Sequence, residues 1–490
     1  MTYAAKNEAF TKLVEVPPDV LKSATVAIEL PNSVSGRSDA AAAFVLAANL
    51  LVRLFHRVHL IGPDVPLGPH PWKITSTRGA QGILAALSEG AVEWGPPTDG
   101  KVDVAIGIGG APATPATRSV VVGFATDIAR IDSEGAVGPE DVLAALIAAC
   151  FGAAQAFLHV AAAAGAPLTP NAPFAFRLPP RTRFDAIDLG AVHVAGIGAI
   201  GSALVYGLAH LACTGTVVPI DADRVDWTNL QRYVLMTAAD VESIKVEVAA
   251  RALAGSSLAV IPFNGTYQEY MRKHPDAHIR LAVTALDSNA GRRDVARLLP
   301  RRVVNASTTD RIITVSRHGF ADGRACLFCV YADRSRALTR EQIVAGELGV
   351  EAWEVERLLA ENRAVDAAFV ARVEAHRREA AGTFAEMIGL PLASFHQRAV
   401  CGGAQIETPS GVVVAPLSFI SAAAGLLLLA ELLGEVTLRD DDARPNYLRM
   451  DMLSSPTFAD RDVRLPDPGH ACICKDVDYI EVYRARHGAA

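Results

Sequence analysis

Residues 192–221 read VHVAGIGAIGSALVYGLAHLACTGTVVPID, and this stretch decides the fold. It begins with a short apolar run, continues through a glycine turn into a helix-like segment, and ends in a second apolar run, which predicts a strand–helix–strand unit. Gly196, Gly198 and Gly201 form the pattern G-x-G-x-x-G between the first strand and the helix. Positions without side chains let backbone N–H groups and a helix N-terminus approach phosphates closely. The stretch therefore predicts a nucleotide site in an α/β fold.

Asp221 ends the second strand, about twenty residues after the glycines, where a carboxylate can bind the hydroxyls of a ribose. NAD and ATP both fit these residues, and a purely structural glycine turn is a further alternative. The sequence continues as DADRVDWTNLQR (221–232), which adds Asp223, Asn229 and Arg232. A dehydrogenase has no need of this polar set. Asp223 alone can be an ordinary turn residue, because acidic residues are common at strand ends.

Two more polar residues follow in order. Lys245 lies in ESIKVEVAARAL (242–253), which predicts a helix, and Asp287 lies at a predicted strand end in TALDSNAGRR (284–293). With Asp-x-Asp and Asn-Leu-Gln-Arg, this ordered set resembles the active site of the family that contains the ThiF and MoeB adenylyltransferases and the ubiquitin-activating enzymes. The resemblance covers residues 190–330 well and residues 400–475 more loosely.

The resemblance implies that the protein uses ATP to activate a carboxylate. A free carboxylate is a poor electrophile, so it first attacks the α-phosphate of ATP and expels pyrophosphate. That step needs positive charge at the phosphates and an ordered Mg²⁺ ion. Arg232 and Lys245 are expected at the β- and γ-phosphates, and Asp287 is expected to bind Mg²⁺. By the same resemblance Asn229 helps to position the phosphates and Asp221 binds the ribose.

The alternation of apolar strands with amphipathic helices occurs twice, which predicts two parallel sheets with covered faces. The predicted strands of the first half are residues 26–30, 58–62, 102–109 and 119–125, with a helix from about residue 139. Those of the second half are residues 192–196, 216–221, 280–286 and 302–307, with an apolar helix at about 417–433. After its first strand the first half reads PNSVSGRSDA (31–40), without closely spaced glycines. We interpret the first half as a degenerate copy; two unrelated α/β domains are the alternative.

Four of the seven cysteines form two close pairs, Cys326-Leu-Phe-Cys329 and Cys472-Ile-Cys474. This spacing predicts a closed zinc site with a structural role, which would tie the end of the chain to the adenylation sheet. The second pair is one residue shorter than the C-x-x-C that is usual in the family, and His470 can replace one of its thiolates. Buried free thiols are the alternative.

Cys401 stands outside both pairs, in RAVCGGAQIETPSG (398–411). Ubiquitin-activating relatives carry their reactive cysteine in this crossover region. The resemblance therefore implies that Cys401 attacks the acyl-adenylate, releases AMP and forms a thioester. The alternative is a small apolar loop or core residue, which is what we expect of Cys150 and Cys213 in their apolar helical surroundings.

The composition argues against several classes of partner. The net charge is −7 and no long basic run occurs, so no nucleic-acid partner is expected. Residues 412–433 are long and apolar enough to suggest a membrane span, but Pro416 and Glu431 favour a buried helix. No membrane partner is therefore expected. The first twenty residues lack the apolar core of a secretory signal and the cysteine count is odd, which predicts reduced thiols in the cytoplasm.

We therefore predict an α/β protein with a Rossmann-like adenylation domain, preceded by a degenerate α/β (pseudo-adenylation) domain and carrying a helical insertion. The expected boundaries are 1–180 for the N-terminal domain, 181–335 for the first part of the adenylation domain, 336–400 for the insertion and 401–490 for the C-terminal part. The expected reaction is ATP-dependent adenylation of the C-terminal carboxylate of a ubiquitin-like protein, then thioester formation on Cys401 and transfer to a conjugating enzyme. A homodimer is compatible with this function. One alternative is an adenylyltransferase for a sulfur-carrier protein or a ribosomal peptide, without a cysteine step. The alternative of another class is a nucleotide-binding scaffold.

Overall fold

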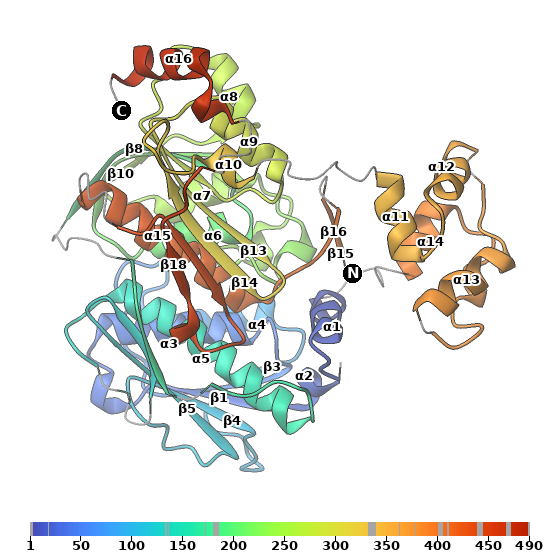
Figure 1. Cartoon of the computed structure of the whole chain (residues 1–490). Helices are drawn as coiled ribbons and strands as arrows, with labels where there is room; N and C mark the ends of the chain where they lie inside the picture. The colour runs from blue at the N-terminus through green and yellow to red at the C-terminus, as the bar shows by residue number, and fades with distance from the viewer. Residues whose placement is uncertain are drawn as a thin grey trace. The chain divides into compact units, whose positions relative to one another are not determined.

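The computed structural model of the chain describes residues 3–17, 19–132, 135, 137–171, 173–179, 186–331, 340–361, 363–377, 379–399, 405–408, 411–438, 444–466 and 472–488. Contacts between residues divide the chain into two compact units. The larger unit is Met1–Tyr331 with Pro416–Ala490, and the smaller unit is Ala332–Ala415. Figure 1 shows the elements of both units, coloured along the chain.

The first half of the larger unit contains a seven-stranded sheet in the order β3-β2-β1-β4-β5-β6-β7. Its strands are β1 (Thr25–Glu29), β2 (Arg57–Ile61), β3 (Ala91–Trp94), β4 (Val104–Ile108), β5 (Arg118–Ala125), β6 (Ile128–Asp132) and β7 (Phe174–Arg177). The helices and turns of this half are α1 (Tyr3–Leu13), α2 (Val20–Ser23), η1 (Asn32–Val34), α3 (Ser38–Leu51), η2 (Arg78–Ala80), α4 (Gln81–Leu87) and α5 (Val142–Ala163). Strands β1 and β4 are buried along their whole length, as expected of central parallel strands with helices on both faces.

The second half contains a nine-stranded sheet in the order β10-β9-β8-β12-β13-β14-β17-β18, with β11 paired to β9. Its strands are β8 (Ile187–Ala195), β9 (Cys213–Asp221), β10 (Leu258–Val260), β11 (Phe263–Asn264), β12 (Leu281–Thr284), β13 (Arg302–Thr309), β14 (Ile312–His318), β17 (Tyr447–Asp451) and β18 (Asp460–Asp462). The α-helices are α6 (Ala199–Leu208), α7 (Lys245–Leu253), α8 (Tyr267–Lys273), α9 (Asn289–Arg297), α10 (Leu327–Val330), α15 (Ser418–Thr437) and α16 (Val477–His487). The 3-10 turns are η3 (Trp227–Asn229), η4 (Ala238–Asp240), η6 (Pro456–Phe458) and η7 (Ile473–Lys475).

The two sheets share one topology. Counted from one edge, the first five strands of each sheet are parallel. They follow the same order, β3-β2-β1-β4-β5 in one sheet and β10-β9-β8-β12-β13 in the other. The α/β class, with a Rossmann-like second half and a related first half, is thus confirmed. Each predicted strand coincides with an observed one, and the shared order favours a duplicated unit over two unrelated domains.

One edge of each sheet differs from the prediction of parallel strands. Strands β5, β6 and β7 pair antiparallel, and so do β13, β14, β17 and β18. Short turns explain two of these pairs, because a connection of a few residues can join only antiparallel neighbours. Asp127 between β5 and β6, and Asp310 between β13 and β14, have φ values of 56° and 52°, which tight turns use. Strand β18 is exposed throughout and has no apolar run that would have predicted it.

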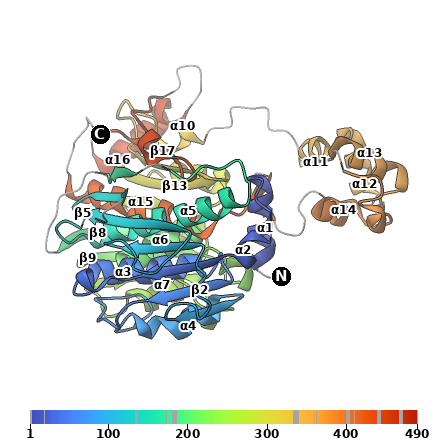
Figure 2. The ribbon, with the colours of Figure 1, turned by 90° about the horizontal axis from the view of Figure 1, so that it is seen from below.

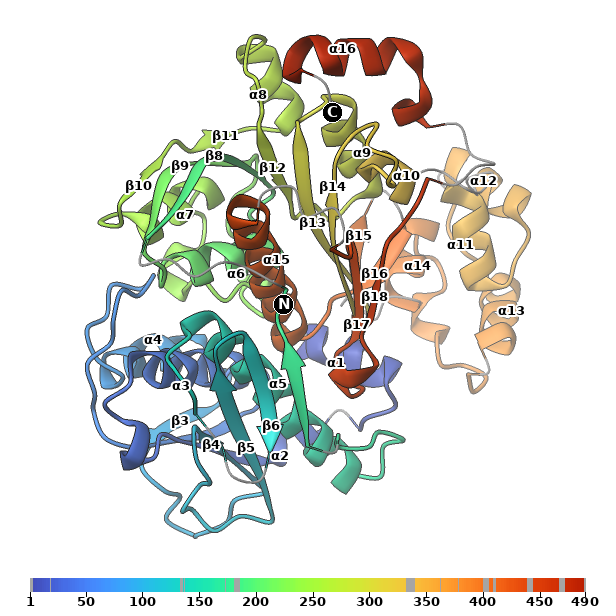
Figure 3. The ribbon, with the colours of Figure 1, turned by 60° about the vertical axis from the view of Figure 1, so that its left-hand side comes forward.

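A layer of four apolar helices lies between the two sheets. Helix α3 packs on α5, α5 on α15, and α15 on α6, and Figures 2 and 3 show these helices from two further directions. Helices α5 and α15 are long and apolar enough to cross a membrane, but 89% of the apolar window is buried inside the protein in both. Burial in the core accounts for their composition, so they are weak evidence for a membrane span.

The first half carries its own anion where a nucleotide-binding copy would receive a phosphate. Asp39 lies in the first turn of α3 and is fully buried. Its carboxylate accepts the backbone N–H groups of Ala40 and Asp141 at 2.9 and 3.0 Å and pairs with Arg37 at 2.8 Å. A helix N-terminus attracts negative charge, and here a side chain supplies it. This arrangement agrees with the interpretation of the first half as a degenerate copy.

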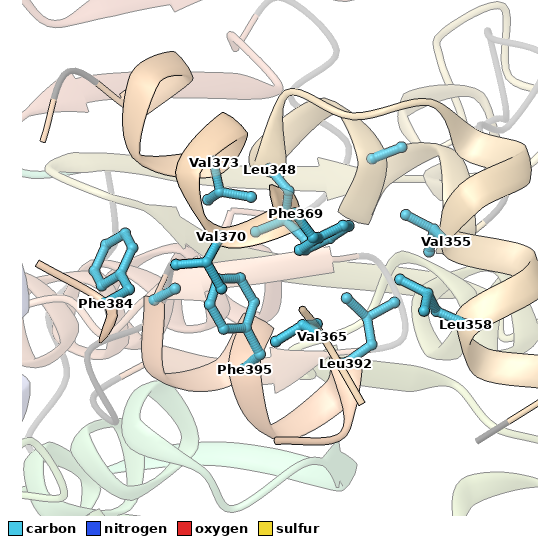
Figure 4. Close-up of a cluster of buried hydrophobic side chains, with 12 residues drawn as sticks. Leu348, Val355, Leu358, Val365, Phe369, Val370, Val373, Phe384, Leu392 and Phe395 are labelled. Atoms are coloured by element: carbon cyan, nitrogen blue, oxygen red, sulfur yellow. The ribbon is translucent and has the colours of Figure 1, made fainter. Parts of the chain in front are cut away.

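The smaller unit is helical, with a short hairpin near its end. Its elements are α11 (Arg340–Leu348), α12 (Ala352–Ala360), α13 (Ala367–Arg377), η5 (Ala385–Met387), α14 (Leu392–Ala399), β15 (Gln405–Thr408) and β16 (Gly411–Val414). Figure 4 shows its apolar core, in which Phe369, Phe384 and Phe395 meet edge to face. The buried carboxylate of Glu374 accepts the backbone N–H groups of Gly382 and Phe384 at 3.0 and 2.7 Å. Because these bonds and the apolar cluster lie within the smaller unit, this unit has a core of its own.

Candidate active site

The predicted glycine turn joins β8 to α6 at the point where the sheet order reverses. Strand β9 lies on one side of β8 and β12 on the other, and open α/β sheets bind ligands outside the carboxyl ends of strands at such a point. Gly196 has a φ of 95°, which favours glycine. A Cβ at Gly201 would lie 2.0 Å from the carbonyl oxygen of Gly196, and Gly198 is the N-cap of α6. The glycines therefore keep the backbone tight at the ligand-binding edge.

Asp221 at the end of β9 fastens this turn to the neighbouring strand. Its carboxylate accepts the backbone N–H groups of Ile197 and Asp223 at 2.7 and 2.9 Å. Burial raises the pKa of Asp221 above its usual range, against the positive charge of Lys245. One carboxylate thus sets the position of the glycine turn and remains at the strand end where ribose binding is predicted.

Lys245 is the first residue of α7 and points at the same strand end. Its Nζ lies 2.7 Å from Asp223 Oδ2 and 3.9 Å from Asp221 Oδ1. Burial disfavours its charged form, but Tyr233 and the two carboxylates outweigh burial and raise the pKa of Lys245. Asp223 is therefore more than the turn residue that the sequence suggested, because its carboxylate holds the Lys245 ammonium group.

Tyr233 brings Arg232 and Lys245 together, although nothing in the sequence marked it as a site residue. The Arg232 guanidinium lies 5.4 Å and the Lys245 Nζ 5.5 Å from the centroid of its ring, within the range of cation–π attraction. Arg232 is only 7% exposed, and burial lowers its pKa. Its buried Nη1 has no hydrogen-bond partner among the described residues.

Asn229 has a structural role in this state. Its Oδ1 accepts the backbone N–H of Asp226 at 3.0 Å, and the Asp226 carboxylate accepts the backbone N–H of Thr228 at 2.7 Å. This reciprocal cap closes η3, the turn that precedes Arg232. The predicted contact of Asn229 with phosphates remains a prediction; the observed bond shapes the turn.

Asp287 follows β12 and is exposed at the same edge of the sheet. Its negative charge acts on both Arg232 and Arg292. Arg292 is nearly buried, donates from Nε to Asn305 Oδ1 at 3.2 Å and lies 4.8 Å from the ring centroid of Tyr331. An exposed carboxylate beside anchored cations suits a Mg²⁺ ion that also binds phosphate oxygens.

The first half of the chain holds the loop that carries these groups. Side chains of the first half donate to five backbone carbonyls between residues 228 and 236: Lys6 to Thr228 at 2.7 Å, Arg53 to Leu230 and, at 3.1 Å, to Met236, Asn49 to Val234 at 2.9 Å, and Trp72 to Leu235 at 2.9 Å. No periodic pattern in the sequence could predict these contacts, since their partners lie more than 160 positions apart. The degenerate half thus positions the loop of the other half.

The four paired cysteines meet in one buried cluster, and their sulfur atoms all lie within 4.8 Å of one another. Four of the Sγ–Sγ distances are 3.7 Å (Cys326–Cys329), 3.5 Å (Cys326–Cys472), 3.1 Å (Cys329–Cys472) and 3.5 Å (Cys329–Cys474). Tetrahedral zinc with bonds of about 2.3 Å needs sulfur atoms about 3.8 Å apart. The cluster can therefore hold a metal ion, and the shorter loop of the second pair does not prevent it.

Two predicted residues lie outside the described part of the chain. These are Cys401, the predicted thioester nucleophile, and His470, the alternative zinc ligand. Cys150 and Cys213 are buried core residues, as expected, and burial raises the pKa of both thiols. Cys150 lies in helix α5, but Cys213 begins strand β9 and not the helical segment that was expected.

Comparison with known proteins shows the family of the chain and two proteins that are similar to it. The model of the ThiF family matches residues 177–474. The chain is 31% identical over 493 residues to the uncharacterized protein y4jF of Sinorhizobium fredii (strain NBRC 101917 / NGR234), covering 96% of this chain and 92% of that protein. Among solved structures, a crystal structure of selenomethionine-labelled PaaA aligns with 30% of this chain and 48% of its own at 21% identity, with a TM-score of 0.23.

Proposed function

The chain belongs to the ThiF family, whose members are adenylyltransferases, and we propose that it activates the C-terminal carboxylate of a ubiquitin-like protein. In the proposed reaction this carboxylate attacks the α-phosphate of ATP, pyrophosphate leaves, and the acyl-adenylate remains in the crevice beside β8 and β12. A thioester on Cys401 and transfer to a conjugating enzyme would follow, in the cytoplasm.

The observation that carries the proposal is the buried guanidinium of Arg232, whose Nη1 has no hydrogen-bond partner among the described residues. A buried donor without a partner is costly, so this Nη1 supports the proposal of an anionic ligand. Lys245 lies on the same Tyr233 ring, and the charge of Asp287 reaches Arg232. A triphosphate and its metal ion would satisfy all three groups, whereas a scaffold that merely binds a nucleotide has no use for this set.

The proposed cofactors are ATP and Mg²⁺ in the crevice and Zn²⁺ at the cysteine cluster. Bound Mg²⁺ would neutralise phosphate charge and orient the leaving pyrophosphate. The protein's own contribution is to fix Arg232 through Tyr233 and the turn that Asn229 caps. The zinc site would be closed by four thiolates and therefore structural.

The test is ATP–pyrophosphate exchange with a ubiquitin-like protein whose chain ends in an exposed glycine. Exchange should require Mg²⁺ and the free C-terminal carboxylate, so the same protein with a C-terminal amide should give none. Equal exchange with the amide would refute the proposal, because the carboxylate is the group that attacks ATP. The gene neighbours of this chain are the first place to look for the substrate.

Cys401 is expected to act after adenylation. Cys401→Ala should retain pyrophosphate exchange within about twofold, since the adenylate forms before the thiol attacks. It should fail to form the covalent adduct with the carrier that a reducing agent releases, which gel electrophoresis with and without thiol detects. The matched control is Cys213→Ala, which should still form the adduct. Adduct formation by Cys401→Ala would place the nucleophile elsewhere, and no adduct in the wild type would favour a sulfur-carrier or ribosomal-peptide substrate.

Arg53 is expected to set nucleotide affinity from outside the site. Arg53→Met removes the donors to Leu230 and Met236, leaves buried carbonyls unpaired and loosens the loop that carries Arg232. ATP binding should weaken about tenfold, as measured by equilibrium titration. Arg53→Lys should recover only part of the affinity, because an ammonium group cannot span both carbonyls. The exposed Arg57→Met should bind ATP like the wild type.

A further inference from the structure

The loop that carries Asp287 is fastened on both sides by one buried arginine. Arg292 lies in α9 and is 4% exposed. Its Nη2 donates to the Leu286 carbonyl oxygen, and its Nη1 donates to Asn289 Oδ1 at 3.3 Å. Leu286 directly precedes Asp287, and Asn289 follows it by two positions. The backbone at Asp287 therefore depends on where the Arg292 guanidinium is held.

A fully buried asparagine of β13 holds the remaining side of this guanidinium. Asn305 Oδ1 accepts from Arg292 Nε at 3.2 Å and from Thr284 Oγ1 at 2.8 Å. Because a guanidinium has only donors, the amide oxygen must face Arg292 and the amide nitrogen must point elsewhere. That nitrogen donates to the Tyr331 hydroxyl at 2.9 Å and to Ser316 Oγ at 3.1 Å. Asn305 thus connects Arg292 to Tyr331 in one defined orientation.

Tyr331 is held at three points, and two of them involve this network. The centroid of its ring lies 4.8 Å from the Arg292 guanidinium, within the range of cation–π attraction. Its hydroxyl accepts from Asn305 and donates to Ser307 Oγ at 3.2 Å. Its backbone carbonyl accepts from Arg293 Nη1 at 3.3 Å. Since Tyr331 is also the C-cap of α10, it joins the helix of the cysteine cluster to the loop that carries Asp287.

We propose that Tyr331 is a positioning residue for the Mg²⁺-binding carboxylate of Asp287, acting through Arg292 and Asn305. The inference deepens the proposed function and rests on it. Burial lowers the pKa of Arg292, and Tyr331 and Asp287 both oppose this shift, so Arg292 interacts with both residues. Mg²⁺ demands near-ideal octahedral geometry, and a carboxylate that is held loosely binds it less well. Loosening Tyr331 should therefore weaken the contribution of Mg²⁺ to ATP binding and leave the other contacts of the nucleotide in place.

The experiment is equilibrium titration with ATP, without carrier, in excess Mg²⁺ and in EDTA. The ratio of the two affinities measures how much Mg²⁺ strengthens ATP binding. Tyr331→Leu should lower this ratio about fivefold and leave the affinity in EDTA within about twofold of the wild type. Tyr331→Phe keeps the ring beside Arg292 and should give an intermediate ratio. In an Asp287→Asn background Tyr331→Leu should cause no further decrease, because Tyr331 acts on Mg²⁺ through that carboxylate.

The matched control is Tyr270→Leu, which removes another half-buried tyrosine of the same sheet, whose hydroxyl lies 3.1 Å from His193 Nε2. Its ratio should equal that of the wild type.

A wild-type ratio in Tyr331→Leu would overturn the inference and leave the proposed function standing. Equal weakening of ATP binding in Mg²⁺ and in EDTA would do the same, since it would indicate a merely structural role. A wild-type ratio of one would overturn it as well, because no Mg²⁺ ligand would then need positioning. A wild type that binds no ATP would overturn both the inference and the proposed function. If Tyr331→Leu does not fold, Tyr331→Phe decides the question.

Discussion

Replacing Asp287 with alanine is expected to lower ATP–pyrophosphate exchange by a factor on the order of a thousand, which would make it the most damaging single change at the nucleotide edge. The carboxylate is exposed, so the change should leave the melting temperature within a few degrees of the wild type. The loss follows from the removal of a Mg²⁺ ligand beside Arg232, whose charge Asp287 partly balances. Thioester formation on Cys401 should be lost as well, because no adenylate would form to be captured.

The matched control is Asp276→Ala, which removes an exposed carboxylate from the loop before β12 and should exchange pyrophosphate normally. Asp287→Asn separates charge from shape, since an amide keeps the size but binds Mg²⁺ poorly. Asp287→Asn should therefore resemble Asp287→Ala. Exchange at the wild-type rate in Asp287→Ala would remove this residue from the site assignment.

Replacing Cys326 with serine is expected to lower the melting temperature by on the order of 10 °C and to release the metal ion. Structural zinc contributes directly to folding free energy, and a site with three thiolates holds it far less tightly. The cluster joins α10 to the segment before α16. The remaining contacts of that helix include the buried ring of Tyr483 and hydrogen bonds from Tyr483, Arg486 and His487 to backbone carbonyls of residues 298–301. Limited proteolysis should therefore cut first near α16.

Metal analysis checks this prediction, with about one zinc atom per chain expected in the wild type and much less in Cys326→Ser. The matched control is Cys213→Ser, which alters a buried thiol outside the cluster and should retain the zinc. A wild-type protein with full stability and no bound metal would show that the four thiols are only a packed cluster.

Some residues of the candidate site could be predicted from the local sequence pattern, and others could not. The sequence placed Gly196, Asp221 and Lys245 correctly on a turn, at a strand end and on a helix, because each position follows from apolar periodicity and its neighbours. The helix begins at Lys245, three residues later than the predicted segment 242–253. The sequence left the role of Asp223 open, because the pairing of Asp223 with Lys245 joins two segments across the strand end. It also missed Tyr233, because an aromatic residue in an apolar run looks like ordinary core.

The sequence by itself determined the α/β class, the order along the chain of the polar residues at the predicted nucleotide site, and the two cysteine pairs, since short-range spacing encodes all three. Only the tertiary structure decided that side chains of the first half hold a loop of the second half. Lys6 and Arg53 bind loop carbonyls at positions 228–236, far along the chain. A backbone carbonyl belongs to every residue type, so nothing in the sequence marks which one a distant side chain will bind. Burial then makes the pairing obligatory, because an unpaired buried donor or carbonyl is costly.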